Sequence, residues 1–596
     1  MKKTFKYFVN KRDLLLMWIY PIVIFLLMQS FNFKPLTDMK APTLLLNFLL
    51  FEILMLLLFS IFGRLNFALL FLAVLSCIWG IGDYYVIKFR SAPFMPWDIY
   101  SLKTAASVAE SYDYSLSPKA LITLVCFLLL MLLMFFSDMH IKKSIRIRLS
   151  AIFLCFFALF GMIKLIQAES SVKTFRFYDK LFTPTVMCKR NGIATSFLMQ
   201  LKYIQVEKPE DYSSEQAEEL LISYTGEEEN ISDCPNIIMI MDEAFSDPAV
   251  LGTFSTNKDY MPFLHSLMEN EPNARTGTLD VSVLGGNTAN TEFEVLTGNT
   301  MAFLPQGSIP YQQYINTQTP SLASYLKEFG YQTVAMHPYY ATGWNRDQVY
   351  PRMGFDRTCF LDDFADSSRI RKYVDDQSAF DKIKSVYEEK EKGRPLFLFE
   401  VTMQNHSPYD DTENYNGFTP DIEVTNASGK SLNAYLSLMK ESDAAFQNLV
   451  EYFKEQEEKT LIVFFGDHQP TDSVVSSIWK MNGKSGSSLS EEDRANRYQV
   501  PVVLWANFDL RKDSSNEESL QLSANYLGAE TLKAAGIPLN GYFAYLNELK
   551  ASYPVISAIR TEDAEGNSHP AGTLSEELHS YKMLQYYNMF DERSGK

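Results

Sequence analysis

The sequence has few cysteines, and their spacing does not indicate a disulfide framework or a zinc site. Only six occur in 596 residues, three of them within apolar runs and three scattered along the rest of the chain. A single bridge within the scattered group stays open, because spacing alone does not fix proximity. The apolar three are Cys77, Cys126 and Cys155, and the scattered three are Cys188, Cys234 and Cys359.

The sequence also lacks a glycine-rich phosphate loop, internal repeats and low-complexity tracts. Without such a loop or a basic cleft, a soluble nucleotide donor is disfavoured. Basic residues are outnumbered after residue 167. The whole chain has 54 Lys/Arg and 71 Asp/Glu, and residues 1–167 hold 17 and 8 of these. Residues 168–596 therefore hold 37 Lys/Arg against 63 Asp/Glu. That acidic balance argues against nucleic acid as a partner, so an anionic substrate needs a local basic site.

Long apolar runs fill the first 167 residues instead. Each is close to the length that crosses a bilayer, and no small-residue cleavage site closely follows the first, which indicates a retained helix, not a signal peptide. Buried helices of a soluble protein are the alternative, but residues 121–136 are almost purely Leu, Phe, Met, Val and Ile. We therefore predict a bundle of five transmembrane helices, at about residues 14–33, 43–62, 66–87, 121–136 and 151–166.

Positive charges predict the orientation of these spans. With five crossings, the N-terminal lysines, Arg64 and the basic loop from Lys142 to Arg148 share one side, which should be cytoplasmic. The chain after residue 167 is then extracellular and, because no Ala-x-Ala site occurs in residues 168–234, stays tethered to the cell membrane. Prolines and aromatics between Pro93 and Tyr100 suit the headgroup layer, where they would help to present lipid or, more simply, act as an aromatic anchor.

Strand and helix patterns alternate from Asn236 onward. Continuous apolar strands between helices predict an α/β domain with a mostly parallel sheet covered on both faces. We expect a transmembrane domain at 1–167, a connector with juxtamembrane and linker helices at 168–234, this α/β domain at 235–560 and a tail at 561–596. The expected strands are 237–241, 333–336, 396–401, 461–465 and 500–505, and the clearest helices are 213–224, 321–329 and 432–453.

Two of these strands end on ligand-type residues. Glu243 follows the first, and Asp467 with His468 follows the fourth, so parallel strands would bring them to one edge of the sheet. Thr288 stands in a Gly-Gly-Asn-Thr turn before a segment that can open a helix, where an anion is favoured. Three oxygens and one imidazole favour Mn²⁺ or Mg²⁺, with Zn²⁺ as a further option, and a threonine bound to the ion becomes a nucleophile.

These motifs, in this order, resemble those of the lipoteichoic acid synthase group of membrane phosphoglycerol transferases, within the alkaline phosphatase and sulfatase superfamily. The resemblance implies a sulfatase-like fold, one divalent ion, most readily Mn²⁺, and transfer of glycerol phosphate from phosphatidylglycerol through Thr288. The acceptor would be a lipoteichoic acid chain, a glycolipid or a polysaccharide of the cell envelope. The motifs are Glu243-Ala-Phe, Gly-Asn-Thr288 with Glu292-Phe293, Leu304-Pro-Gln-Gly-Ser308 and Gly466-Asp467-His468.

Four further residues complete the expected site. By the same resemblance, His337, Trp344 and Arg346 contact glycerol phosphate, since a guanidinium donates two hydrogen bonds to phosphate and an indole packs on glycerol carbons. His406 would donate to a phosphoryl oxygen or pass a proton to the leaving group. Without the resemblance, a lone histidine at a strand end is more often a structural residue.

The sequence departs from the family pattern at two positions and leaves rival functions open. Tyr339 stands where an acidic residue is expected and Gln469 where an aromatic one is expected, which puts the acceptor in doubt. Phosphoethanolamine transfer on the same fold stays open, as does a phosphatase, whereas the Cys/Ser-x-Pro-x-Arg context of sulfatases is absent at Thr288. A non-catalytic membrane sensor or scaffold is disfavoured, because all four expected ligands are present.

Overall fold

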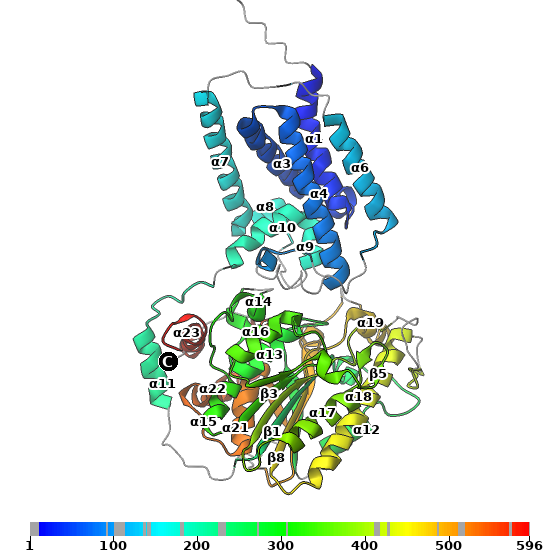
Figure 1. Cartoon of the computed structure of the whole chain (residues 1–596), viewed down its shortest axis with the longest axis vertical. Helices are drawn as coiled ribbons and strands as arrows, with labels where there is room; N and C mark the ends of the chain where they lie inside the picture. Colours follow the sequence, from blue (N-terminus) through cyan, green and yellow to red (C-terminus); the bar gives the residue numbers. More distant parts are fainter. Residues whose placement is uncertain are drawn as a thin grey trace, which may run out of the picture. The chain divides into compact units, whose positions relative to one another are not determined.

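The computed structural model describes most of the chain (Figure 1). Some predicted features lie outside the described residues: the lysines before Lys11, Tyr100, Lys142 with Lys143, and the pair Gln306-Gly307. Contacts divide the chain into two compact units, Met1–Val206 and Glu207–Lys596. The described residues are 11–90, 93–99, 114–134, 139, 145–178, 184–204, 206–224, 234–270, 273–305, 308–409, 418–425, 429–485, 488–510, 519–570 and 575–594.

The first unit is helical and apolar. Three of its helices are long and apolar enough to cross a membrane, at Ala41–Phe62, Leu65–Lys88 and Ile145–Gln167. Two shorter apolar helices, Leu16–Ser30 and Pro118–Met134, occupy the positions of the other two predicted spans. Three spans are thus supported by length and composition, and the count of five stays a prediction. The full helices are α1 Lys11–Ser30, α3 Ala41–Phe62, α4 Leu65–Arg90, α6 Pro118–Met134 and α7 Ile145–Gln167.

Buried amides fasten the short helices α9 (Pro184–Asn191) and α10 (Ile193–Gln200) to the long ones. In α1, Gln29 donates to the carbonyl of Cys188 at 2.7 Å and accepts from the amide of Ile193 at 3.0 Å. In α3, Asn47 donates to the carbonyl of Asn191 at 2.8 Å. Because polar groups buried among apolar helices need partners, these bonds fix where the chain leaves the bundle.

An eight-stranded sheet forms the centre of the second unit, with the order β10-β2-β9-β8-β1-β7-β3-β4. Within this sheet all strands run in one direction except β9, which is antiparallel to both neighbours. The mostly parallel sheet is therefore confirmed. Its strands are β1 Asn236–Asp242, β2 Ala274–Asp280, β3 Gln332–Met336, β4 Arg357–Cys359, β7 Leu396–Val401, β8 Thr460–Gly466, β9 Gln499–Ala506 and β10 Leu520–Ser523.

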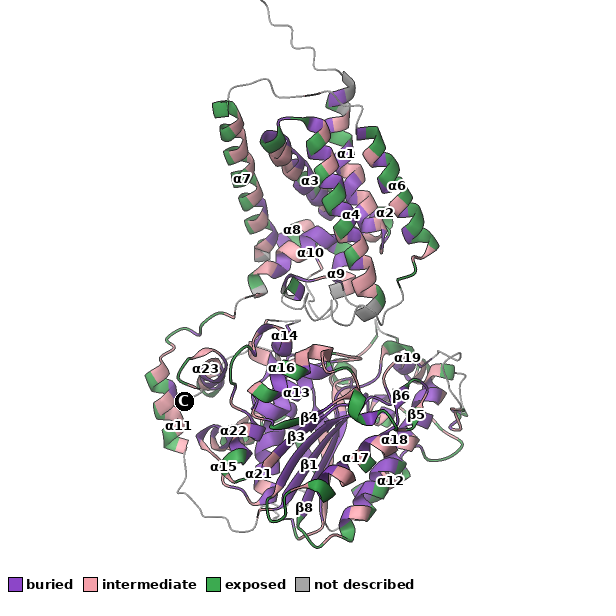
Figure 2. Cartoon of the chain, in the orientation of Figure 1, coloured by how far each residue is buried: buried purple, intermediate pink, exposed green. Residues whose placement is uncertain are grey.

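Helices cover both faces of the sheet, and its central strands are buried along their whole length (Figure 2). On one face, Phe446 of α18 (Lys430–Lys454) stacks on Phe464 of β8 with ring centroids 4.1 Å apart. Helices α12 (Pro262–Asn270) and α17 (Asp376–Glu389) join the same apolar cluster. The helices on the other face include α13 Thr288–Thr297, α15 Leu322–Glu328, α21 Leu527–Ala535 and α22 Gly541–Ser552.

The last helix, α23 (Glu576–Phe590), is an integral part of this unit. Gln585 accepts from the amide of Thr300 at 2.8 Å and donates to its carbonyl at 3.0 Å. Just after α23, Asp591 accepts from Tyr212 at 2.6 Å, close to the start of α11 (Ser214–Tyr224). The helix of the predicted connector and the helix of the predicted tail therefore belong to one layer.

Candidate active site

The ends of β1 and β8 lie next to each other in the sheet. Their parallel ladder pairs Asp242 with Gly466, so Glu243 and Asp467 leave the sheet side by side. A Cβ on Gly466 would lie 1.9 Å from the carbonyl oxygen of Phe245, so this close approach requires glycine. The amide of Ala244 donates to Asp467 Oδ1 at 2.7 Å, which fixes that carboxylate.

Thr288 is the first residue of α13 and faces the same edge. The turn before it needs a left-handed backbone, with φ of 58° at Gly285, 146° at Gly286 and 65° at Asn287. The Thr288 hydroxyl lies 3.4 Å from Glu243 Oε2. One turn further on, the hydroxyl of Thr291 donates to the carbonyl of Asp467 at 2.8 Å, so α13 is tied to the loop after β8. The structure thus brings together all four predicted ligands.

These residues fit a divalent cation. The ligand atoms of Glu243, Asp467 and His468 lie within 4.8 Å of one another, and all three residues are buried. Asp467 Oδ2 and His468 Nε2 are buried without a hydrogen-bond partner in the described part of the chain. Burial raises the pKa of Glu243 well above its usual range, and the charge of Asp467 raises it further. Two buried carboxylates beside an imidazole nitrogen form a donor set that a metal ion stabilises.

Three histidines around this edge are held in the same tautomer. The Nδ1 atom lies against a backbone carbonyl in each, at 2.8 Å from Val401 in His337, 2.8 Å from Ser407 in His406 and 3.0 Å from Gln469 in His468. A carbonyl oxygen can only accept, so Nδ1 carries the hydrogen and Nε2 offers a lone pair. For His468 this is the form that binds a metal.

Burial keeps the other two histidines neutral. It lowers the pKa of His406 to about 4 and that of His337 well below its usual range, and the charge of Arg346 lowers the pKa of His337 further. A neutral ring whose Nδ1 hydrogen is already bonded accepts a proton at Nε2. In this neutral form His406 Nε2 can accept a hydrogen bond, while its donation to a phosphoryl oxygen or transfer of a proton to the leaving group stays a prediction.

Arg346 is buried against a carboxylate, which the sequence did not predict. Its Nε donates to both oxygens of Glu292, at 3.1 and 3.2 Å, and its Nη2 also bonds to that residue. Tyr350 donates to the same carboxylate at 2.8 Å. Since Glu292 lies one turn after Thr288 on α13, the pair fixes the guanidinium beside the nucleophile. The charge of Arg346 also lowers the pKa of Glu243, so it acts on the site.

The residues before Arg346 have a strained backbone. Trp344 and Asn345 both adopt the left-handed conformation, with φ of 56° and 59°. Such values are uncommon outside glycine and each costs of the order of 1 kcal/mol. This segment begins after Tyr340 and leads directly into α16 (Arg346–Arg352), so the strain lies where the predicted substrate contacts gather.

Comparison with known families agrees with this geometry. A sequence model described as Sulfatase matches residues 235–537, more than half of the chain. The chain belongs to the sulfatase family. The match starts at β1 and includes the ends of β1, β3, β7 and β8, so every candidate site residue falls within it.

Several known proteins are similar to this sulfatase-family chain in sequence or in structure. A candidate cyclic beta-1,2-glucan modification protein of Rhizobium meliloti is 31% identical over 415 residues, 68% of this chain and 62% of that protein. Lipoteichoic acid synthase of Staphylococcus aureus is 26% identical over 347 residues, 55% of this chain and 50% of the synthase. This chain therefore spans between half and about three-fifths of their lengths. The Streptococcus pyogenes phosphoglycerol transferase GacH, solved with sn-glycerol-1-phosphate, is 22% identical with a TM-score of 0.49, over 64% of this chain and 95% of GacH.

A polar network beneath the sulfatase-family site was also missed from the sequence. Asn405 donates to Asp242 at 2.9 Å and to Ser442 at 2.8 Å, and Ser442 donates to Asp376. Burial raises the pKa of Asp376 to about 7. These residues come from β1, α17, α18 and the loop after β7, so only the tertiary fold joins them. This network supports, from below, the loops that carry Glu243 and Asp467.

Gln469, which departs from the family pattern, also supports the ligand loop. Its side-chain amide donates to the carbonyls of Asn496 and Gln499, both at 2.8 Å, and it accepts from Arg497 at 3.2 Å. Its carbonyl accepts from the amide of Gly285 at 3.0 Å. This residue therefore joins the loop after β8 to the turn before Thr288.

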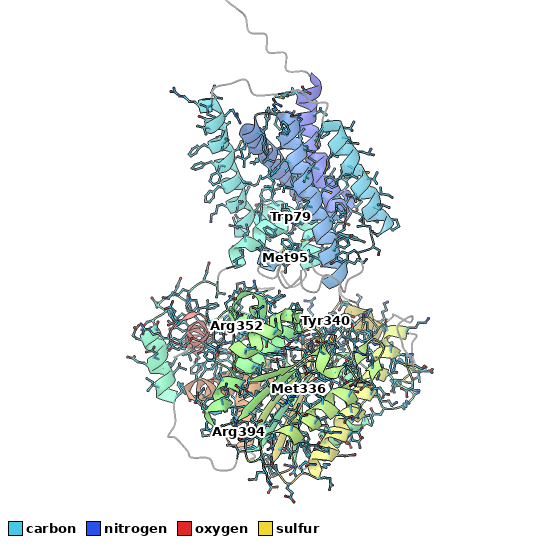
Figure 3. All side chains as sticks on the ribbon, viewed as in Figure 1. Trp79, Met95, Met336, Tyr340, Arg352 and Arg394 are labelled. Atoms are coloured by element: carbon cyan, nitrogen blue, oxygen red, sulfur yellow. The ribbon has the colours of Figure 1, made fainter. Side chains whose placement is uncertain are left out.

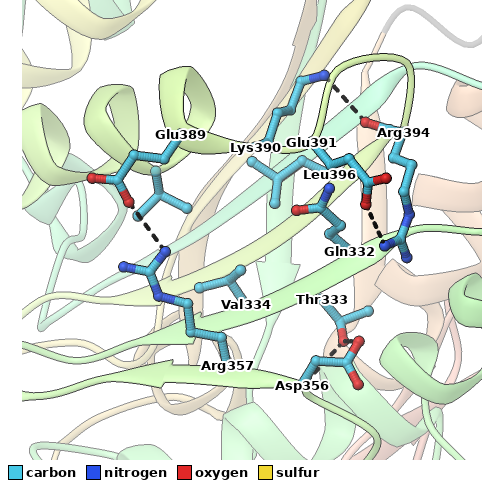
Figure 4. A pocket seen from close by; sticks show the side chains of 11 residues that line it. Gln332, Thr333, Val334, Asp356, Arg357, Glu389, Lys390, Glu391, Arg394 and Leu396 are labelled. Carbon is cyan, nitrogen blue, oxygen red and sulfur yellow. Dashed lines mark hydrogen bonds and ion pairs between the residues drawn. The ribbon is translucent and has the colours of Figure 1, made fainter.

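A cavity of about 370 Å³ lies at the opposite edge of the sheet (Figure 4). It is lined by Gln332 and Leu396, which begin β3 and β7, and by paired charges such as Arg357 with Glu389 at 3.2 Å. The lining reaches along β3 as far as Val334, three residues before His337, so about 10 Å of strand separates His337 from this cavity. The cavity is therefore separate from the catalytic edge.

Breaking the buried pair beside the nucleophile should destabilise the second unit. Glu292→Ala would leave Arg346, only 2% exposed, without its carboxylate, which costs about 3–5 kcal/mol. We expect a lower midpoint for the second unit in denaturant unfolding of the detergent-solubilised chain. The Glu292→Leu/Arg346→Met double variant should lose clearly less, because it removes both charges. An equal loss in the two proteins would contradict the pairing.

Proposed function

We propose that this chain is a metal-dependent phosphotransferase that moves glycerol phosphate from phosphatidylglycerol, through a covalent adduct on Thr288, to an acceptor of the cell envelope. One observation carries the proposal: the Thr288 hydroxyl lies 3.4 Å from Glu243 within a buried set of two carboxylates and one imidazole. A hydroxyl in that position suits a nucleophile, whereas a structural threonine would need no such surroundings.

In the first half-reaction, Thr288 Oγ1 attacks the phosphorus of the lipid headgroup. A bond from that oxygen to phosphorus forms, the bond from phosphorus to the diacylglycerol oxygen breaks, and the threonine proton ends on diacylglycerol. A divalent ion held by Glu243, Thr288, Asp467 and His468, Mn²⁺ most readily and Mg²⁺ or Zn²⁺ otherwise, would lower the pKa of the hydroxyl and neutralise phosphoryl charge. The N-terminus of α13 favours the same anion.

The surrounding residues orient the group and move protons. Arg346, held in place by Glu292, donates from its outer nitrogens to phosphoryl oxygens, and Trp344 packs on the glycerol carbons. His337 Nε2 accepts from a glycerol hydroxyl. His406 Nε2 takes the proton of the acceptor hydroxyl in the second half-reaction, when that oxygen displaces Thr288 from phosphorus, and the proton passes to the threonine.

The membrane placement of the reaction follows from the first unit. Its apolar helices hold the catalytic unit at the bilayer, and the basic segments predict that this unit is extracellular, at the leaflet that carries the lipid donor. The acceptor is then a lipoteichoic acid chain, a glycolipid or a glucan or other polysaccharide, in line with the names of the sequence relatives. Phosphoethanolamine transfer is the second candidate, because the same ligands would serve it.

The test follows the headgroup. Detergent-solubilised full-length protein is given Mn²⁺ and headgroup-labelled phosphatidylglycerol without acceptor. We expect about one equivalent of diacylglycerol in a burst and a glycerophosphoryl group on Thr288 by peptide mass spectrometry, because ping-pong chemistry stops there. Phosphatidylethanolamine serves as the matched donor. Label from it on Thr288, with none from phosphatidylglycerol, would replace the proposed donor by the second candidate.

A further inference from the structure

Tyr340 is an exposed aromatic residue at the catalytic edge of the sheet. Its side chain is 40% exposed. Among the described residues of the second unit, no other aromatic side chain is exposed to this extent. It stands three residues after His337, at the edge where β3 ends (Figure 3). An exposed aromatic beside a candidate catalytic site is placed where it can contact a bound ligand, because its ring offers an apolar face and its hydroxyl a polar tip.

A continuous series of aromatic rings joins Tyr340 to the site. Its ring centroid lies 4.7 Å from that of Tyr339, which lies 6.2 Å from both His337 and Tyr373. Tyr373 in turn lies 5.5 Å from His406. The series therefore starts at the surface and ends at the two histidines that the proposed function uses in substrate contact and proton transfer.

The backbone holds these rings in place. The amide of Tyr339 donates to the carbonyl of His337 at 2.7 Å, and that of Gly343 donates to the carbonyl of Tyr340 at 2.9 Å. The amide of Leu361 donates to the carbonyl of Tyr339 at 3.0 Å. A surface whose aromatic rings are ordered before binding loses little entropy when a ligand stacks on it.

The chemistry of this surface favours a sugar. A pyranose ring has an apolar C–H face that stacks on an aromatic ring and a hydroxylated edge that hydrogen-bonds to phenol groups, and tyrosine offers both. A polyglycerolphosphate chain would instead need several exposed cations. Beside the rings, Lys372 lies 5.1 Å from the Tyr373 centroid, and Arg371 is buried, with its guanidinium donating to the carbonyls of Pro408, Gln404 and His406.

We propose that Tyr340 and Tyr339 form an acceptor subsite that stacks a pyranose ring, so that this enzyme transfers to a glycan. The inference rests on the proposed function and names its acceptor class. A hydroxyl of the bound sugar attacks the phosphorus of the Thr288 adduct. The new bond joins that oxygen to phosphorus, the bond to Thr288 breaks, and the sugar proton passes to the threonine oxygen.

The test measures sugar binding apart from transfer. Calorimetry of the full-length protein in detergent with a linear β-1,2-linked glucose oligosaccharide should show binding that Tyr340→Ala weakens about tenfold. Tyr340→Trp should stay within about threefold of the unsubstituted protein, because it keeps a stacking face. In transfer assays, Tyr340→Ala should raise the KM for the oligosaccharide by a similar factor, while the burst of diacylglycerol, made before any acceptor binds, changes far less.

Met268→Ala is the matched control, because Met268 is 42% exposed on α12 and takes no part in the proposed site. Equal sugar affinity in Tyr340→Ala and the unsubstituted protein, or no sugar binding by either, would overturn the subsite. Glycerol phosphate accepted in place of the sugar with an unchanged KM in Tyr340→Ala would also overturn it. Sugar binding that depends on Tyr340 without any adduct on Thr288 would support the subsite and refute the proposed transfer chemistry.

Discussion

Thr288→Ala is expected to abolish transfer while leaving a protein that still binds its ion. The substitution removes the hydroxyl that lies 3.4 Å from Glu243, and without it no covalent adduct can form. We expect the rate of diacylglycerol release from phosphatidylglycerol to fall at least about a thousandfold. Ion affinity should fall only about tenfold, because the three charged or imidazole ligands remain. Lipid product analysis and calorimetry with Mn²⁺ measure the two quantities.

Thr288→Ser is the matched control for this experiment. Serine keeps the hydroxyl and fits the first position of α13, so a measurable part of the burst should return. Loss of the ion together with activity in Thr288→Ala would show that the threonine is chiefly a structural ligand. Full activity in Thr288→Ala would show that another group carries the phosphoryl intermediate, or that none forms.

Asp467→Asn is expected to remove the ion itself. Its carboxylate has one oxygen fixed by the amide of Ala244, and the other is buried without a hydrogen-bond partner among the described residues. The substitution therefore keeps the shape and loses the charge that an ion needs. We expect the Mn²⁺ affinity to fall at least about a hundredfold and transfer to fall with it. Glu243→Ala should act in the same direction. Calorimetry on the detergent-solubilised full-length chain measures the affinity.

Asp443→Asn separates metal binding from simple loss of a buried carboxylate. Asp443 is equally buried, but it accepts from the amides of Phe263 and Leu264, both at 2.8 Å, at the start of α12. Its replacement should lower stability and leave the Mn²⁺ affinity unchanged. If Asp467→Asn bound Mn²⁺ as tightly as Asp443→Asn, the ligand assignment would be wrong.

The central strands could be predicted because a strand that is buried on both faces is almost continuously apolar in sequence. The runs that became β1, β7 and β8 are almost wholly apolar, and each prediction ends within one residue of the observed strand. The edge at which Glu243 and Asp467 meet then follows from the parallel direction of neighbouring strands. This reasoning needs no side-chain detail, and the structure does bring Glu243, Asp467 and His468 together at that edge.

What the sequence could not show lies in features that only the fold creates. The strand β2 was missed because Arg275, Thr276 and Gly277 interrupt any apolar run, and its pairing with β9 supplies the stability that its composition lacks. Glu292 was recognised only as part of a motif, since the arginine it holds lies 54 positions further along the chain. The tautomers of the three histidines depend on carbonyls that no spacing reveals.

The packing of α11 against the end of the chain gives the molecule a mechanical property. Tyr212 and Ser214 at the start of α11 both bond to Asp591, and Arg593 forms an ion pair with Glu215 at 2.9 Å. Along the polypeptide, α11 is the first helix after residue 206 and stands before β1. A pulling force that is transmitted along the chain from residue 206 would therefore act first on these contacts between α11 and the C-terminal residues, before it reached β1.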